Sequence, residues 1–150
     1  MFLGQNSFLY LFAILLIAGC GSSAVDDSEE ARRKRAGGEL KETVAVSGKV
    51  SLAGQPAGKV TLQAYTQESG MEPAAQCLTN ADGTYCWNTY GECDGLVPGS
   101  YRLAFKKAGA RQKPGARDQL GGKYLNPLEN DFPLEVVSGE PQTEVNYNLE

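Results

Sequence analysis

The chain has 150 residues, a net charge of −4 and no histidine. Its 14 basic and 18 acidic residues are interspersed, which excludes the concentrated positive surface that nucleic-acid binding requires. Without histidine, a nucleophilic triad lacks its usual base and a metal site lacks one of its common ligands. These facts predict a protein with no catalytic residues, no metal site and no cofactor.

The first 20 residues end in a motif that predicts a lipid anchor. Residues 8–20 read FLYLFAILLIAGC, and they close with a branched apolar residue, two small residues and Cys20. This pattern resembles the lipobox of bacterial lipoprotein signals. The resemblance implies that residues 1–19 are a signal peptide, which is removed, and that Cys20 is acylated. Each buried methylene of such a chain contributes about 0.8 kcal/mol, so two or more chains hold a protein on a membrane.

Two other interpretations of this opening stay open: a secretory signal that is cleaved without lipidation, and a retained membrane span. The apolar run is short for a span, which needs about 20 apolar residues. The stretch before the run, residues 1–7, contains no Lys or Arg, which departs from the usual signal. Residue Gly21 is not the aspartate that marks inner-membrane retention in many Gram-negative lipoproteins, so the resemblance favours the outer membrane.

Residues 20–42 are predicted to form a disordered, charged tether behind the lipidated cysteine. They contain few apolar residues, too few to offset the entropy of ordering, so at most a short frayed helix is expected. Four acidic residues precede four basic ones: Asp26, Asp27, Glu29, Glu30, Arg32, Arg33, Lys34 and Arg35. The alternative interpretation is that the basic cluster contacts anionic lipid headgroups or a cell-wall polymer.

Residues 43–150 are predicted to form one β-sandwich domain. Apolar and polar residues alternate with period two, which indicates strands with one buried face. About seven strands are expected, at 43–52, 59–66, 75–79, 84–89, 100–107, 132–138 and 143–149. Regularly spaced short strands with turns between them are typical of a sandwich, because each apolar face must pack against another sheet. A hairpin at Asn80-Ala81-Asp82-Gly83 is expected, and residues 108–131 form a long irregular segment.

Five motifs in order resemble the carboxypeptidase regulatory-like domain, a transthyretin-like (Ig-like) β-sandwich. They begin at Val46, Gly54, Val60, Thr79 and Gly95 and read VSGKV, GQPA, VTL, TNADGTY and GLVPGSY. The segments 123–127 and 133–136 also resemble a stretch common in small bacterial lipoproteins with this domain. The resemblance implies an all-β accessory module and no catalytic activity. In physical terms, Gly48 is expected to allow a backbone or a ring to approach closely.

Three cysteines follow Cys20, and an odd number outside the cytoplasm suggests one disulfide and a spare thiol, or a bridge to a partner. If Ala81 and Asp82 form a two-residue loop, Cys77 lies opposite Cys86, and a Cys77–Cys86 disulfide is predicted. If Gly83 instead forms a bulge, the register shifts and Cys86 to Cys93 closes the intervening loop.

The candidate ligand contacts lie in loops, because long loops on a rigid scaffold often carry function. Tyr85 and Trp87 share one face of a strand and are expected in the core, not in an aromatic platform for a glycan or a peptide. The predicted contact residues are basic or aromatic: Tyr90, Arg111, Lys113, Arg117, Lys123 and Tyr124. Their charge suggests an anionic envelope polymer or an envelope protein as partner.

The sequence thus predicts a non-catalytic, membrane-anchored lipoprotein, held through lipid on Cys20 and acting as a binding or structural module of the cell envelope. It is expected at the outer membrane, facing the periplasm or the cell surface. The alternatives are an accessory subunit of an envelope enzyme or transport complex, and a glycan- or peptide-binding domain.

The lipid anchor predicts the mass of the mature amino terminus. Mass spectrometry of the membrane-extracted chain should find that it begins at an acylated Cys20. An amino terminus at another residue, or an unmodified cysteine, would contradict the anchor.

Overall fold

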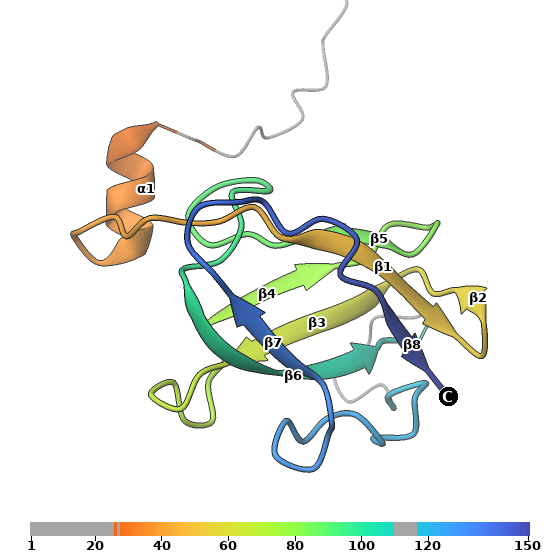
Figure 1. The fold of residues 1–150 in the computed structure, drawn as a ribbon. Coiled ribbons are helices and arrows are strands. Elements are labelled where there is room, and N and C mark those ends of the chain that lie inside the picture. The colour runs from red at the N-terminus through yellow and green to blue at the C-terminus, as the bar shows by residue number, and fades with distance from the viewer. Residues whose placement is uncertain (1–25, 27, 110–116) are drawn as a thin grey trace, which may run out of the picture.

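The computed structural model of the chain describes residues 26, 28–109 and 117–150. The predicted signal peptide, Cys20, Arg111 and Lys113 lie outside the described residues. One helix precedes eight strands along the chain (Figure 1): α1 (Glu29–Ala36), β1 (Ser47–Leu52), β2 (Gln55–Pro56), β3 (Val60–Tyr65), β4 (Ala75–Leu78), β5 (Thr84–Cys86), β6 (Gly99–Lys107), β7 (Pro133–Val136) and β8 (Tyr147–Leu149).

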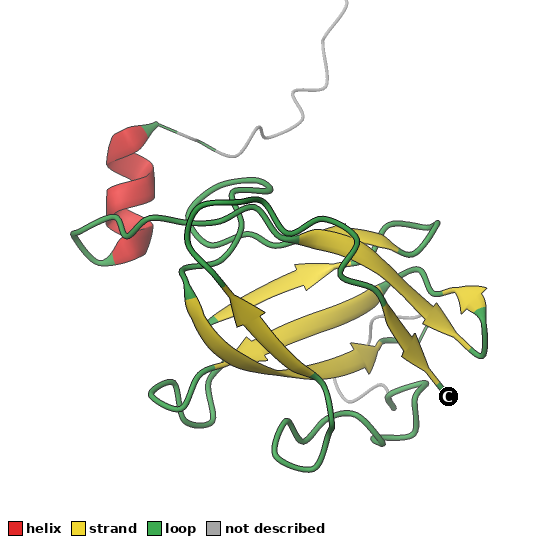
Figure 2. Cartoon of the chain, viewed as in Figure 1, coloured by secondary structure: helices red, strands yellow, loops and turns green. Residues whose placement is uncertain are grey.

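The strands form two facing sheets, which confirms the predicted all-β sandwich (Figure 2). In the first sheet, β1 pairs antiparallel with β2 and β5 and parallel with β8. The second sheet has the order β4-β3-β6-β7, and all of its pairs are antiparallel. Strands near the two ends of the domain therefore meet on β1.

The alternation of apolar residues determines which side chains enter the space between the sheets. Alternate residues of β3, namely Val60, Leu62 and Ala64, are fully buried, while the residues between them are half-buried. Aromatic rings fill much of the core: the Phe105 ring centroid lies 5.0 Å from that of Phe132 and 5.4 Å from that of Tyr147. Trp87 and Tyr85 are buried, as predicted.

The predicted hairpin at residues 80–83 is wrong, although the turn itself forms. The Gly83 amide donates to the Asn80 carbonyl oxygen at 3.0 Å, but β4 and β5 belong to different sheets. Thr79 holds the chain beside β3, because its hydroxyl donates to the Ala57 carbonyl oxygen and accepts from the Val60 amide. On the far side of the turn, the Gly83 carbonyl oxygen accepts from the Val50 amide of β1. The turn therefore carries the chain from one sheet to the other.

Part of the predicted tether is ordered as α1, which differs from the disorder expected for residues 20–42. Ser28 caps its first turn by accepting from the Ala31 amide, and Gly37 ends it in the left-handed conformation. Acidic residues occupy the first turn and basic residues the last, which suits the helix dipole. Among residues 26, 28–109 and 117–150, no helix is long and apolar enough to span a bilayer.

Gly48 of β1 lies against the backbone of the segment before β8, as the sequence predicted for a strand glycine. A β-carbon at this position would lie 1.9 Å from the Val145 carbonyl oxygen. The same oxygen accepts from the Tyr85 hydroxyl at 2.7 Å, so it cannot move away without breaking a partly buried hydrogen bond.

Substituting Gly48→Ala should lower the free energy of unfolding by about 3 kcal/mol or more, because the new methyl group overlaps fixed backbone. Urea unfolding of the detergent-solubilised full chain, followed by the fluorescence of the single tryptophan, measures this change. Gly109→Ala is the control, since its β-carbon would make only an ordinary contact at 3.8 Å. Equal stability of the two variants would contradict the close approach.

Candidate functional site

A large open groove crosses the outer face of the second sheet at one end. Its volume is about 1060 Å³, and it lies between the loop of residues 66–72, which follows β3, and the segment 125–131. Figure 1 shows these two segments projecting from the same end of the molecule. We call this feature the end groove. Its size is in the range of protein sites that hold a small ligand or a short peptide.

The walls of the end groove are aliphatic and exposed. Five large hydrophobic side chains are exposed in the described part of the chain, and three of them line the groove: Met71 at 92%, Leu128 at 75% and Leu125 at 41%. Exposed apolar side chains are unremarkable when scattered, but a cluster of them at a concave surface marks an interaction site.

The floor of the groove comes from three neighbouring strands. Tyr65 of β3 pairs with Arg102 of β6, which pairs with Pro133 of β7. Each floor residue has a buried neighbour in its own strand: Ala64 beside Tyr65, Leu103 beside Arg102 and Leu134 beside Pro133. Because successive side chains of a strand point to opposite faces, the floor residues face outward. The two-residue period of the strands therefore creates this surface.

The charges in the groove are one cation and two carboxylates. Within the described ranges, the Arg102 guanidinium makes no salt bridge and no side-chain hydrogen bond. Glu135 accepts a hydrogen bond from the Ser100 hydroxyl, and Asp131 lies exposed at the rim. Partial burial raises the pKa of the Tyr65 phenol above its ordinary value, so the phenol is neutral and donates to Gln63 Oε1.

Both walls are fixed by hydrogen bonds to the sandwich or within their own loops. In the first wall, Thr66 and Ser69 bond reciprocally, each backbone amide donating to the other hydroxyl at 2.9 and 3.0 Å. In the second, the Tyr124 carbonyl oxygen accepts from the Phe105 amide at 2.9 Å and from Asn130 Nδ2 at 2.7 Å. The groove is therefore preformed, which reduces the entropy lost on binding.

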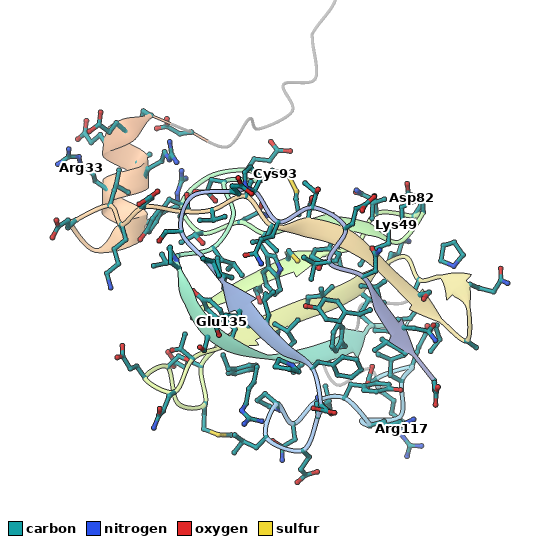
Figure 3. The ribbon with its side chains drawn as sticks, viewed as in Figure 1. Arg33, Lys49, Asp82, Cys93, Arg117 and Glu135 are labelled. Atoms are coloured by element: carbon teal, nitrogen blue, oxygen red, sulfur yellow. A yellow bond between two sulfur atoms is a disulfide. The ribbon has the colours of Figure 1, made fainter. Side chains whose placement is uncertain are left out.

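Among the predicted contact residues that the structure describes, Tyr90 lies apart from Lys123 and Tyr124, so these residues form no single site. The Tyr90 hydroxyl accepts from the Lys41 amide near α1. Tyr124 is buried in the core, and Lys123 lies over its ring at 5.1 Å while donating to the Glu150 carbonyl oxygen. Arg117 is exposed, and Figure 3 places it at the opposite end of the molecule from Cys93, the neighbour of the Tyr90 loop.

The sequence analysis did not predict the groove residues as a group, although three features of the sequence pointed to them. The segments 125–127 and 133–135, which line the groove, fall within the two stretches noted for resembling small lipoproteins. Two further signals were present in the sequence. Met71 and Leu128 are large apolar residues in turn-rich loops, where polar residues are the rule.

The predicted Cys77–Cys86 disulfide is wrong. Cys86 bonds to Cys93, with their Cα atoms 5.2 Å apart, and Cys77 is a buried free thiol. The reason is that β4 and β5 lie in different sheets. Cys77 points into the core beside Tyr85, whereas Cys86 follows Tyr85 by one residue and points to the opposite face. The alternative pairing that the sequence left open is the one that forms.

Asp94 organises the loop that the disulfide closes. Its carboxylate accepts from the amides of Thr89, Tyr90 and Gly91 at 2.7 to 2.9 Å, and it lies 3.5 Å from the Arg32 guanidinium of α1. The helix is thereby attached to the sandwich. Over the described ranges, no group of His, Cys, Asp and Glu is arranged to hold a metal ion.

Comparison with known proteins assigns the chain to no family. The chain matches no protein-family model, and a search of curated proteins finds no match. A similar solved structure is the crystal structure of a DUF3823 family protein from Parabacteroides merdae ATCC 43184, with 17% identity and a TM-score of 0.42. The similarity covers 73% of this chain and 46% of that one, so the chain spans less than half of its length. It carries no argument about function.

The cysteine arrangement predicts that the Cys77 thiol reacts slowly with alkylating reagents. Burial raises the pKa of Cys77 from 9.0 to about 12. At pH 8 this lowers its thiolate fraction on the order of 1000-fold, and the thiolate is the reactive form. Iodoacetamide should therefore label Cys77 only in denaturant, and peptide mapping without reduction should link Cys86 to Cys93. Rapid labelling of Cys77 in the folded chain, or a peptide linked through it, would contradict this arrangement.

Proposed function

We propose that the chain is a lipid-anchored, non-catalytic binding module of the cell envelope, and that its end groove binds an extended apolar segment of an envelope protein. The observation that carries the binding proposal is the gathering of Met71, Leu125 and Leu128 at one preformed groove. The lipobox ending at Cys20 supports the membrane location, and the resemblance of residues 43–150 to a carboxypeptidase regulatory-like domain supports the accessory role.

The chemistry of the walls favours a peptide over a glycan. Sugar rings stack on exposed aromatic faces, but the aromatic residues that line the groove are the half-buried Tyr65 and Tyr101, which has only 7% of its surface exposed. The Tyr65 hydroxyl is bonded to Gln63, and Tyr85, Trp87 and Tyr124 are buried. Aliphatic side chains complement the leucine, isoleucine and valine side chains of an extended peptide, whose apolar burial supplies most of the affinity.

The floor adds a polar preference. Arg102 lies between Tyr65 and Pro133, with Asp131 and Glu135 at the rim. A guanidinium is weakly hydrated and forms bidentate bonds with carboxylates, so it suits a carboxylate on the bound peptide. The expected ligand therefore carries several aliphatic residues and one Asp, Glu or terminal carboxylate.

The attachment of α1 to the sandwich supports a defined orientation at the membrane. The Arg32–Asp94 contact and the hydrogen bond from the Lys41 amide to the Tyr90 hydroxyl fix the ordered part of the tether at the disulfide loop. Figure 1 shows α1 and the two groove loops at different ends of the domain. The proposed tether therefore joins the sandwich at the end where α1 is attached, and the groove loops lie at a different end.

The groove can be tested by selecting peptides from a random library on the detergent-solubilised full chain. We expect enriched peptides that contain several aliphatic residues and an acidic residue. Met71→Asp or Leu128→Asp should weaken the binding of a selected peptide at least about tenfold, as for a well-packed interface anchor. Arg102→Gln should relax the preference for the acidic residue while leaving the aliphatic preference.

Val137→Asp is the matched control, because Val137 is also exposed, at 62%, but does not line the groove. Its affinity for the selected peptides should equal that of the unaltered chain. The proposal is wrong if no peptide is enriched, or if Val137→Asp weakens binding as much as Leu128→Asp does.

A further inference from the structure

The free edges of the two sheets are not equally protected. Along β7, the Gln142 side chain acts as a short strand: its Nε2 donates to the Glu135 carbonyl oxygen at 3.0 Å, and its Oε1 accepts from the Val137 amide at 3.3 Å. The edge strand β2 contains Pro56, which has no amide hydrogen to donate. Such devices prevent an exposed edge from pairing with another chain.

The edge strand β4 lacks these devices. Within residues 26, 28–109 and 117–150 it pairs only with β3, where the Thr79 amide donates to the Val60 carbonyl oxygen at 2.9 Å. Because hydrogen-bonding residues alternate along an antiparallel strand, Cys77 also directs its backbone groups toward β3. Gln76 and Leu78 then direct their amides and carbonyl oxygens away from the sheet.

The side chains around this edge are uncharged. The strand reads AQCL, and Leu78 is 57% exposed on the outer face. The neighbouring outward residues of β3 are Thr61, Gln63 and Tyr65, which also carry no charge. Charged side chains and prolines are the usual obstacles to edge pairing, and this edge has neither.

We propose that β4 pairs with β4 of a second copy of this chain, antiparallel and about a twofold axis at Cys77. Residues directly opposite in an antiparallel pair share a face, so the pairing must keep Cys77 inward and Leu78 outward. Placing Gln76 opposite Leu78 of the second copy satisfies this rule and pairs the free backbone groups of both residues in both copies. The second sheet of one copy and the second sheet of the other then form one continuous sheet of eight strands.

Self-complementarity is what favours a second copy over an unrelated strand. The pairing is isologous: each Leu78 packs against a Gln76 side chain on the uncharged outer face, and no like charges oppose each other along the strand. Since the edge is only 4 residues long, the dimer should be weak and should form at high protein concentration. This inference does not depend on the function of the end groove.

The pairing can be tested by replacing Gln76 with the photoreactive residue benzoylphenylalanine in the full chain. The variant is prepared once with heavy and once with light isotopes, and the two preparations are mixed in detergent. Illumination should give a covalent dimer whose mixed-isotope crosslink joins position 76 to residues 77–79 of the other copy. The same replacement at Val137, beside the edge that Gln142 covers, should give no such dimer.

Leu78→Lys provides an independent test, because it places a charge on each copy near the twofold axis. It should abolish the crosslinked dimer. It should change the free energy of unfolding in urea, followed by Trp87 fluorescence, by no more than about 0.5 kcal/mol, as expected for an exposed residue. A crosslink that joins position 76 to its own copy, to a distant surface or to a different protein would overturn the self-pairing. So would a dimer that is unaffected by Leu78→Lys.

Discussion

The pairing of β1 with strands from both halves of the domain is the constraint on which the rest of the structure depends. Val50, in the middle of β1, is fully buried, and its amide bonds to the Gly83 carbonyl oxygen beside β5. On the other side, β8 runs parallel to β1, and the absence of a side chain at Gly48 lets the Val145 backbone approach. The first sheet forms only when residues near position 50 meet residues near position 147, about 100 positions later. Such non-local pairings are entropically costly to close, so the domain is expected to form as a unit.

The second sheet packs against the first through the core, and its outer face has three regions that differ in polarity and in exposure. One end carries the aliphatic walls and the Arg102 floor of the end groove. The β3–β4 half is uncharged, and the β7 edge is covered by Gln142. All three follow from the same alternation that fills the core, because each inward residue is followed by one that faces outward. The proposed ligand groove and the proposed edge contact are therefore parts of one surface that adjoin at Tyr65, and no residue of β4 lines the groove.

The cysteines occupy two different settings: Cys86 and Cys93 form a disulfide in a loop, and Cys77 is a free thiol in the core. The Cys86–Cys93 bond closes a short loop, and Asp94, which directly follows Cys93, accepts from three backbone amides of that loop while it contacts Arg32. The same loop is tied to the core by Trp87, whose amide donates to the Val46 carbonyl oxygen at 3.0 Å. Cys77 lies in the packed interior, where burial raises its pKa and suppresses its reactivity. The spare thiol that the odd cysteine count suggested is therefore the buried Cys77.

The sequence by itself determined the class of fold, most of the strands and the inward residues, because period two is a local property that burial on one side imposes on each strand. It also identified the tight turn at 80–83 and the role of Gly48, since backbone geometry restricts which residues those positions accept. Only the tertiary structure decided which strands pair. The 80–83 turn connects two sheets and does not form a hairpin. For that reason the disulfide joins Cys86 to Cys93 and not the predicted pair, Cys77 and Cys86. The same holds for the end groove: Met71, Arg102 and Leu128 are far apart in sequence, and only the arrangement of β3, β6 and the 125–131 segment brings them to one end of a sheet.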